Sequence, residues 1–504
     1  MNFKKLLPLV PVLFGLLFCI LFHKQGVGIN LVLFELPLLL FIYPKIKQLL
    51  FAGKLVAAIV VVSLLLVVVR HTGVVIFFHV VSFLLLLGML AAPKINAVGL
   101  AAIASFLNFF QGTYQYVMSL LNLANTNKAS KAVLKFMKLG VLPLLVIWVF
   151  ALMYQTASPW FDELAGNFLG LIEDGFVLFF EQLNPAKIGL VLLGTLIAGL
   201  AIYATSNTFF NEGIAKLTST RTRERNKFYS GKSTALFTEY KIGVLLFVGL
   251  NGLLLLVNAL DIYWVWFHFS WTGEFLKQFV HEGTYLLIFS ILISAGLVLY
   301  FFKGNQHFLQ KVWLKRLAQL WLIQNILLAI SVAVRNWWYV QYFALAFKRI
   351  GVFYFLAFII VALIAVVIMV RKQKSLYFLR KYNSLAALLI FFCMVIPNWN
   401  IVIAKYNFSH ANSAFVELNF MSKLDKTALP YLKKSEAALK EFSTTQQELF
   451  RFKTRDMYLT EYDYSVQIDN RISEVLPKLA NQHWLSWNFA DRKLLKQLNE
   501  IVIN

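Results

Sequence analysis

Long apolar stretches separated by short polar segments dominate the chain. A membrane-spanning helix rises 1.5 Å per residue and needs about 20 residues to cross the hydrocarbon core. Backbone groups find no water there, so each stretch must close its hydrogen bonds within a helix. Eleven stretches meet these demands: 6–22, 29–44, 55–70, 74–91, 138–156, 187–206, 240–260, 283–302, 314–334, 350–370 and 384–403. The predicted fold class is all-α, a polytopic transmembrane helix bundle of about 11 spans over residues 1–403 followed by a small helical C-terminal domain.

Residues 97–121 form a segment of mixed character. It is apolar over 98–107 and then carries Asn108, Gln111 and Gln115. Counting it as a further span would carry the lysines that follow it to the opposite face of the membrane. We therefore predict an interfacial or re-entrant helix.

The N-terminal segment resembles a signal peptide, because Lys4 and Lys5 precede an apolar stretch. It contains two prolines and lacks a small-residue cleavage site, so we interpret it as a first, uncleaved span. The cysteines Cys19 and Cys393 both fall within predicted spans. This placement predicts neither a disulfide framework nor a thiolate metal site.

Composition indicates the class of protein, and the distribution of charge indicates its orientation in the membrane. The 504 residues are 60% hydrophobic and only 14% charged, whereas soluble domains carry about 25% charged residues. With the predicted spans, 26 basic residues before residue 404 lie on one face of the membrane and 7 on the other. The positive-inside rule makes the richer face cytoplasmic. The N-terminus is then cytoplasmic and the C-terminus extracytoplasmic.

The net charge of +23 is largely explained by this topology, and no nucleic-acid recognition motif accompanies it. We therefore expect the lipid bilayer, and no nucleic acid, as the partner. A basic loop on the cytoplasmic face is predicted to contact anionic lipid headgroups. Its residues are Arg221, Arg223, Arg225 and Lys227.

The tail, residues 404–504, has the composition of a soluble domain. It holds 14 Lys or Arg and 12 Asp or Glu residues, and apolar residues recur at helical spacing over 494–502. We predict an extracytoplasmic helical domain with an envelope protein as its possible partner.

Ionisable and polar residues near the outer ends of the spans are the candidates for function, because a charge at a helix centre costs about 2.5–3.5 kcal/mol. They either line an outward-facing cavity or pair with one another in the wet interface. Glu35 and His79 lie a turn or more inside apolar runs, so pairing in the wet interface explains these two residues less well. The predicted outer-face cluster comprises Glu35, His79, Asp261, His281, Glu282, Arg335, Tyr339, Asn398 and Tyr406, with His268 nearby.

Motifs of known chemistry are missing from the sequence. A zincin helix needs a second histidine four residues after the first, and Tyr285 stands four residues after His281. The sequence also shows no glycine-rich phosphate loop and no serine-centred elbow. We expect no metal and no cofactor.

Three stretches in the second half carry a resemblance. They are His281–Glu282–Gly283–Thr284, the run from Arg335 to Tyr339 with Tyr342, and Asn398–Trp399–Asn400 with the string from Ile403 to Asn407. Together they resemble a bacterial membrane-protein family catalogued as domain of unknown function 4173, which is related to 4153. The family shows Gly-Leu-Thr before a further arginine, where this chain has Ala344–Leu345–Ala346 before Arg349.

The resemblance extends over residues 25 to 504. It implies a multi-span protein of the bacterial cytoplasmic (inner) membrane with an extracytoplasmic C-terminal segment and no established activity. Topology places the motif residues near the outer surface, so we expect one cluster beneath the tail. Either Glu282 or Asp261 would be the counter-charge of Arg335, and the cluster would act as a structural clamp or as a ligand site.

Three classes of function remain open. The absence of catalytic constellations and the separate tail favour a non-enzymatic envelope scaffold or sensor-like protein. One alternative is a transporter or flippase for a lipid or small solute, which inverted repeats or broken helices would support. The other is a membrane enzyme at the outer leaflet that uses His281 or Glu282 as acid or base.

Overall fold

The computed structural model describes residues 6–124, 184–206, 208–221, 233–269, 273–302, 312–450 and 459–503, with a few isolated positions between 147 and 161. The regular elements in these ranges are helices, apart from an isolated bridge between Thr220 and Lys374. This confirms the helical class.

Nine helices within these ranges are long and apolar enough to cross a membrane. They are α3 (Ile29–Lys47), α4 (Phe51–Arg70), α5 (Gly73–Ala91), α10 (Pro185–Ile202), α12 (Ser233–Asp261) with the π-helical turn η3 (Ile262–Phe267), α13 (Gly273–Phe301), α14 (Trp313–Phe343), α15 (Phe347–Lys372) and α16 (Leu376–Val395). A shorter apolar helix, η1 (Leu7–Leu9) continued by α2 (Val10–Phe22), occupies the first predicted span. The predicted span 138–156 lies outside the described residues. The number of spans beyond nine therefore stays a prediction.

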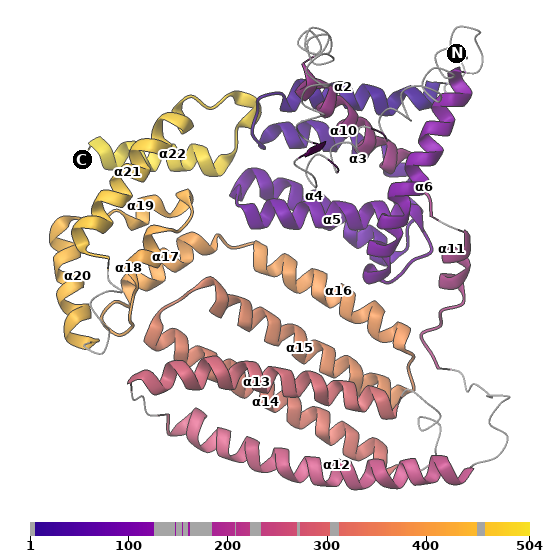
Figure 1. The fold of residues 1–504 in the computed structure, drawn as a ribbon, viewed down its shortest axis with the longest axis vertical. Helices are drawn as coiled ribbons and strands as arrows, with labels where there is room; N and C mark the ends of the chain where they lie inside the picture. Colours follow the sequence, from indigo (N-terminus) through magenta and orange to yellow (C-terminus); the bar gives the residue numbers. More distant parts are fainter. Residues whose placement is uncertain are drawn as a thin grey trace.

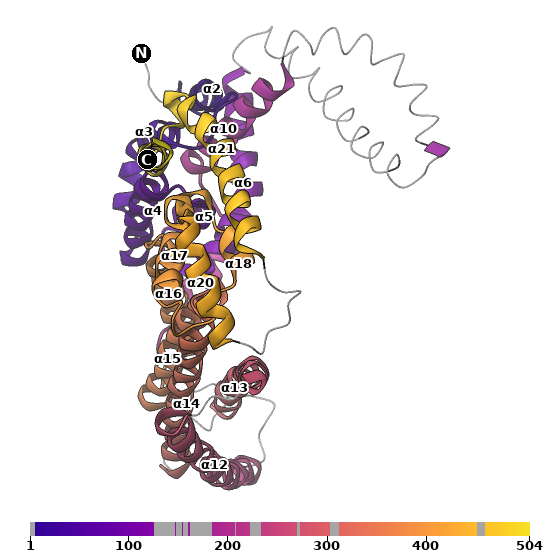
Figure 2. The ribbon, with the colours of Figure 1, turned by 90° about the vertical axis from the view of Figure 1, so that its left-hand side faces the viewer.

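The apolar helices lie side by side and form a tall, narrow slab. Figure 1 shows them running across the view, from α2 and α10 at one end of the long axis to α12 at the other. Seen end-on in Figure 2, the slab is thin, and α13 stands to one side of α14 and α15.

Two hydrophobic cores hold the slab together. The first lies among α2–α5, α10 and the start of α6, and the second among α12–α15. Helix α16 belongs to both, since Leu388 and Val395 pack in the first core and Phe378 and Leu379 in the second. It is the helix that joins the two halves.

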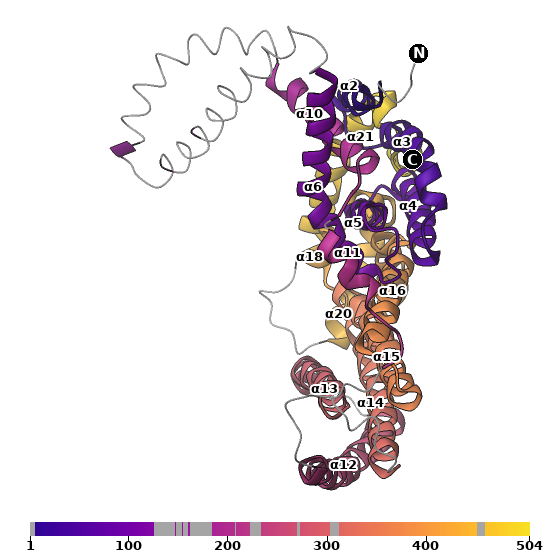
Figure 3. The same ribbon diagram turned by 90° about the vertical axis from the view of Figure 1, so that its right-hand side faces the viewer.

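Helix α6 (Val98–Ala124) has a direction of its own. It runs along the long axis of the molecule, across the ends of the apolar helices (Figures 1 and 3). Its first turns pack on α5, where Gly88 meets the backbone of Ala101. The helix covers the segment predicted to be interfacial or re-entrant, and that assignment stays a prediction. The short helix α11 (Thr208–Ala215) follows α10.

The last apolar helix lies earlier in the chain than predicted. Helix α16 covers 376–395 where the sequence suggested 384–403. The Ser375 hydroxyl caps its N-terminus by accepting a hydrogen bond from the Phe378 amide. The helix ends just before Pro397, because proline has no N–H to continue the ladder and crowds the preceding turn. Asn398 then caps the next helix, α17 (Trp399–Ser409).

After α16 the chain forms α17, α18 (Leu418–Ser422), η5 (Lys426–Ala428), α19 (Leu429–Leu432), α20 (Glu436–Leu449), α21 (Glu461–Ala480), η7 (Trp484–Ser486) and α22 (Phe489–Ile503). We call this group of helices the C-terminal domain, and its standing as a separate domain stays a prediction. Figure 1 shows it at one end of the apolar helices, opposite α6. Tyr464 is fully buried in its core and donates a hydrogen bond of 2.9 Å to the Leu432 carbonyl. This core also takes in Ala344 and Ile350, which lie between α14 and α15 and at the start of α15. The domain is thus continuous with one end of the slab.

Candidate functional site

The C-terminal domain is anchored to the second core through the turn between α14 and α15. The Asn407 side chain accepts a hydrogen bond from the Leu345 amide at 2.8 Å and donates one to the Leu345 carbonyl at 3.0 Å. The Phe415 amide donates to the Tyr342 carbonyl at 2.8 Å. Because one side-chain amide pairs with both the N–H and the C=O of Leu345, it fixes the position of the turn relative to α17.

Arg349 holds the same turn from the membrane side. Its guanidinium donates to the carbonyls of Phe343 and Ala344 and lies 4.4 Å from the centre of the Tyr339 ring. Ala344 itself has φ 60° and ψ −174°, a conformation adopted almost only by glycine. The turn is therefore strained, and Asn407 and Arg349 together keep it in place.

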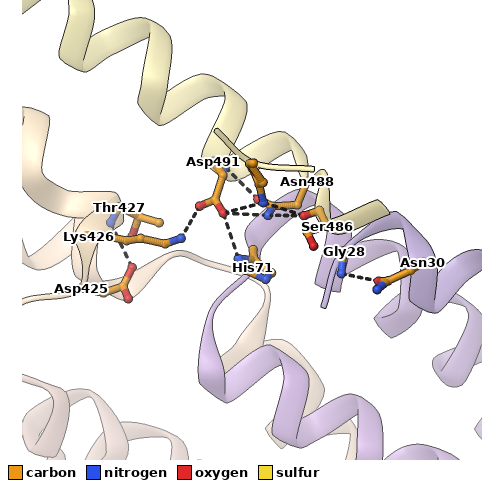
Figure 4. Close-up of polar contacts among 10 residues, drawn as sticks. Gly28, Asn30, His71, Asp425, Lys426, Thr427, Ser486, Asn488 and Asp491 are labelled. Atoms are coloured by element: carbon orange, nitrogen blue, oxygen red, sulfur yellow. Dashed lines mark hydrogen bonds and ion pairs between the residues drawn. The ribbon is translucent and has the colours of Figure 1, made fainter. Parts of the chain in front are cut away.

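A separate junction joins the C-terminal domain to the first core, and Figure 4 shows it in close-up. Asp491 of α22 is 2% exposed. The Lys426 ammonium lies 2.6 Å from its Oδ1, and the Asn488 side-chain amide donates to its Oδ2 at 2.8 Å. His71, at the end of α4, brings Nδ1 within 3.5 Å of the same Oδ2. The buried carboxylate thus connects the domain to the end of α4.

His71 is held in a setting that disfavours its charged form. Burial lowers the pKa of His71, although the Asp491 carboxylate and a hydrogen bond to the Val27 backbone act in the opposite direction. The residue also adopts a left-handed backbone conformation, with φ 46°. Near neutral pH the imidazole is therefore uncharged beside the carboxylate.

The loop before α3 completes this junction. The Ile29 amide donates to the Trp487 carbonyl at 2.9 Å, and the Ser486 hydroxyl donates to the Gln25 side chain at 3.0 Å. Gly28 approaches so closely that a Cβ there would lie 2.4 Å from the Ser486 carbonyl carbon. Asn30 orders the loop by accepting from the Gly28 amide at 2.7 Å (Figure 4). The loop and the domain therefore meet backbone to backbone.

A cavity of 440 Å³ opens at this junction. Its charged and titratable lining within the described residues consists of Lys24, His71, Lys426, Lys478, His483 and Asp491.

Among the residues predicted from sequence, Asp261 and Arg335 form an ion pair. Asp261 is one of the two carboxylates considered for Arg335; the side chain of the other, Glu282, lies outside the described residues. The Ser331 hydroxyl donates to Asp261 Oδ2 at 2.7 Å, and the Trp266 indole approaches the Ser331 oxygen at 3.3 Å. This buried pair joins the ends of α12 and α14. His281 and Glu282 lie on α13, and their side chains are outside the described residues.

Glu35 and His79 form a second buried pair, in the first core. His79 Nε2 lies 3.0 Å from Glu35 Oε2, and Ser63 Oγ lies 2.9 Å from His79 Nδ1. At 1.5 Å per residue, the three groups sit about 9–10 Å from the ends of α3, α4 and α5. The sequence had not singled out Ser63, although it is the only polar residue between Lys54 and Arg70 of α4.

The remaining predicted residues make contacts of their own. Asn398 donates to the Thr427 hydroxyl at 3.0 Å. The Tyr406 hydroxyl accepts from Gln341 at 3.5 Å, and its ring stacks on His410 with centroids 4.0 Å apart. The described members of the predicted set thus take part in several separate contacts, and the single cluster, which includes His281 and Glu282, stays a prediction.

The basic loop predicted to contact lipid is described only at its first residue. The Arg221 amide donates to the Gln373 carbonyl at 3.1 Å, and its guanidinium donates to the Phe302 carbonyl. Arg223, Arg225 and Lys227 lie outside the described residues. Lipid contact by this loop stays a prediction.

The residues that the structure describes include no group of three or more histidine, cysteine, aspartate or glutamate side chains able to hold a metal ion. The site consists of two buried charged pairs and two junctions with the C-terminal domain.

An array of apolar helices with internal charged pairs defines a polytopic integral membrane protein. A family model described as Domain of unknown function (DUF4153) matches residues 37–435, and the chain belongs to this family. It is the relative of 4173 named above, and the finer resemblance to 4173 stays an interpretation. No curated protein and no solved structure matches the chain.

Proposed function

We propose that the protein is a non-enzymatic sensor-like scaffold of the bacterial cytoplasmic membrane, whose C-terminal domain couples the two helix cores. The observation that carries this proposal is that one domain is anchored to the ends of both cores. Asn407 holds the turn beside the second core, and Asp491 holds the end of α4 in the first. A partner that displaces the domain would act on both halves at once.

The two junctions differ in chemistry, which supports a sensing role. The Asn407 junction uses neutral amide groups, whose hydrogen bonds are insensitive to pH and salt. The Asp491 junction uses Lys426, a carboxylate and a histidine. Charge-based contacts respond to acid, salt and charged ligands. The link to the first core is therefore the one that conditions outside the membrane would release first.

The coupling is testable by distances at the far ends of the helices. Spin labels are placed at Lys54 of α4 and Lys372 of α15 in a chain with both cysteines replaced, and the distance distribution is measured by electron paramagnetic resonance. Asp491→Asn should broaden the distribution. Asp469→Asn is the matched control, because it removes an exposed partner of Lys433 inside the domain. Equal distributions for both variants and the parent chain would contradict coupling.

The orientation belongs to the same proposal. We place the N-terminus in the cytoplasm and the C-terminal domain outside, with eleven spans that add α2 and residues 138–156 to the nine helices. The basic residues support this, being 26 on the proposed cytoplasmic face and 7 on the other before the tail. A compartment-dependent reporter after Asn504, with a control reporter in the 207–239 loop, tests it. A cytoplasmic signal from the tail reporter would reject the orientation.

The proposed partners follow from this placement. Anionic lipids would meet the basic cytoplasmic face, and an envelope protein would meet the C-terminal domain. Tyr462 and Trp484 are 77% and 64% exposed on that domain, and photo-crosslinkers at these positions would identify such a protein.

A second candidate function, proton-coupled transport, is favoured by the Glu35–His79–Ser63 group. The Ser63 hydroxyl has two acceptors within reach, the Val60 carbonyl at 3.0 Å and His79 Nδ1 at 2.9 Å. If its proton points to Val60, the Ser63 oxygen accepts a hydrogen bond from Nδ1–H; if it points to Nδ1, that nitrogen is the acceptor. The group thus has room for one proton more or less inside the bundle. Proton flux into liposomes that Glu35→Gln abolishes would favour transport over the scaffold.

The third class, an enzyme of the outer leaflet, depends on His281 and Glu282. The described residues add no support for it.

A further inference from the structure

A cavity of 430 Å³ opens where α13, α14 and α15 meet the C-terminal domain. Thr284 comes from α13, Asn336 and Tyr339 from α14, Lys348 and Arg349 from α15, and Phe420 of α18 closes one side. It lies at the second core, apart from the Asp491 junction. Segments that are distant in sequence and were singled out by motif therefore line one space.

The charge of this cavity is positive. Lys348 and Arg349 line it, and within the described ranges no carboxylate lines it and no ion pair reaches either residue. The Asn336 side chain donates to the Arg349 backbone carbonyl at 2.9 Å, which fixes the start of α15. Arg349 directs Nη1 to the neighbouring turn and still contributes its positive charge to the cavity, whereas the ammonium of the exposed Lys348 is available for a ligand.

Thr284 supplies an independent sign of a missing partner. The residue is 5% exposed, and its hydroxyl has no hydrogen-bond partner among the described residues. A buried polar group left unsatisfied costs about 1–3 kcal/mol. An oxygen-rich ligand in the cavity would remove this cost by accepting a hydrogen bond from the hydroxyl.

The rest of the lining is apolar. Phe347, Val352 and Phe420 contribute side chains to the walls, and Phe347 is 45% exposed at the first turn of α15. A small inorganic anion would leave this apolar surface uncovered. A ligand with an anionic group joined to a hydrocarbon chain covers both parts.

We propose that this cavity binds a phosphorylated amphiphile, with its phosphate beside Lys348, Arg349 and the Thr284 hydroxyl and its hydrocarbon chain along Phe347 and Val352. The chemistry matches an anionic phospholipid of the leaflet that faces the C-terminal domain. The proposal is independent of the sensor function, since it needs neither coupling between the cores nor a protein partner.

The test uses the full chain in phosphatidylcholine vesicles that contain a small fraction of photoactivatable phosphatidylglycerol. After illumination, labelled peptides are mapped by mass spectrometry, so labelling at 347–352 is counted apart from labelling of the basic opposite face. We expect Lys348→Gln to lower labelling at this site about tenfold, because a charge-assisted contact is lost. Thr284→Val should lower it by a few-fold.

Lys372→Gln is the matched control, since it removes the same charge at the other end of the same helix. It should leave labelling at 347–352 unchanged, and thermal unfolding should show that all three variants are folded. Equal loss for Lys348→Gln and Lys372→Gln would overturn the site, as would equal labelling by a photoactivatable phosphatidylcholine. Complete competition by inorganic phosphate would show that the cavity takes a free anion and would overturn the amphiphile.

Discussion

The two helix cores are packed by different means. In the first core, backbones touch: a Cβ on Gly15 of α2 would lie 2.4 Å from the Val191 carbonyl oxygen of α10, and one on Gly88 would lie 1.9 Å from the Ala101 oxygen. In the second core, Gly249 and Gly252 of α12 face open space, and large side chains such as Phe247 fill the interior. Small residues let membrane helices approach closely. The first core is therefore set by backbone fit, and the second by side-chain packing.

The buried ion pairs of the two cores also differ in the residue that faces the carboxylate. Glu35 faces a histidine, a side chain that has a neutral form with one donor and one acceptor nitrogen, whereas Asp261 faces an arginine, which is always charged. The first pair has a neutral alternative, and the second is obliged to remain ionic. This contrast predicts how each core responds when a carboxylate is removed.

Removing one carboxylate from each core should give the largest difference. Asp261→Asn removes the carboxylate that pairs with the buried Arg335 charge, and we expect a loss of about 3–5 kcal/mol in unfolding free energy. Glu35→Gln leaves a histidine that can become neutral and bond the amide, so the loss should be about 1–2 kcal/mol. Unfolding in mixed micelles measures both. Equal losses would remove the distinction between the pairs.

Adding one methyl group to each core should give the next largest effect. Gly88→Ala forces α5 away from the Ala101 backbone, and we expect destabilisation of about 1–3 kcal/mol. Gly252→Ala meets no atom within 4 Å and should be neutral or gain up to about 1 kcal/mol from helix propensity. Thermal unfolding in detergent distinguishes them. A harmless Gly88→Ala would mean that backbone fit does not define the first core.

The strained turn beside the second core offers a stabilising change. Ala344→Gly removes a side chain from a backbone conformation that disfavours it, so a gain of about 1 kcal/mol is expected. Ala346→Gly is the control, because Ala346 has an ordinary extended conformation with φ −145°. The control should bring no gain in thermal midpoint. A gain in both would point to loop composition instead of strain.

The smallest effect concerns acid at the first core. The folded-state pKa of His71 lies below its ordinary value of 6.5, so the unfolded chain binds more protons as pH falls through and below that value. The stability should therefore decrease from about pH 6.5 downward. His71→Asn, a residue that tolerates the left-handed backbone, should flatten this slope. Thermal midpoints between pH 7.5 and 5 measure it, and parallel curves for the two proteins would contradict the assignment.

Apolar run length and charge predicted the helices well, because the thickness of the bilayer, and not the neighbouring helices, sets the length of a span. The exception, α16, was misplaced because the apolar run continues past Pro397, where the helix does not. Glu35 and His79 stood out as ionisable groups within apolar runs. Their direct contact, the hydrogen bond of Ser63 to His79 and that of Asn407 to Leu345 all depend on which helices become neighbours. The sequence holds no local signal for such contacts.

Helix α16 has a consequence for how the protein is made. A ribosome delivers the chain from its N-terminus, and segments fold in roughly that order. Most of the first core is present once α11 has been made, and the second lacks only α16 once α15 has been made. The two cores are therefore joined only after residues 376–395 emerge, about three-quarters of the way along the chain, and the C-terminal helices made after them connect the cores a second time. A chain whose synthesis stops before α16 contains both groups of helices but lacks the helix that packs in both cores.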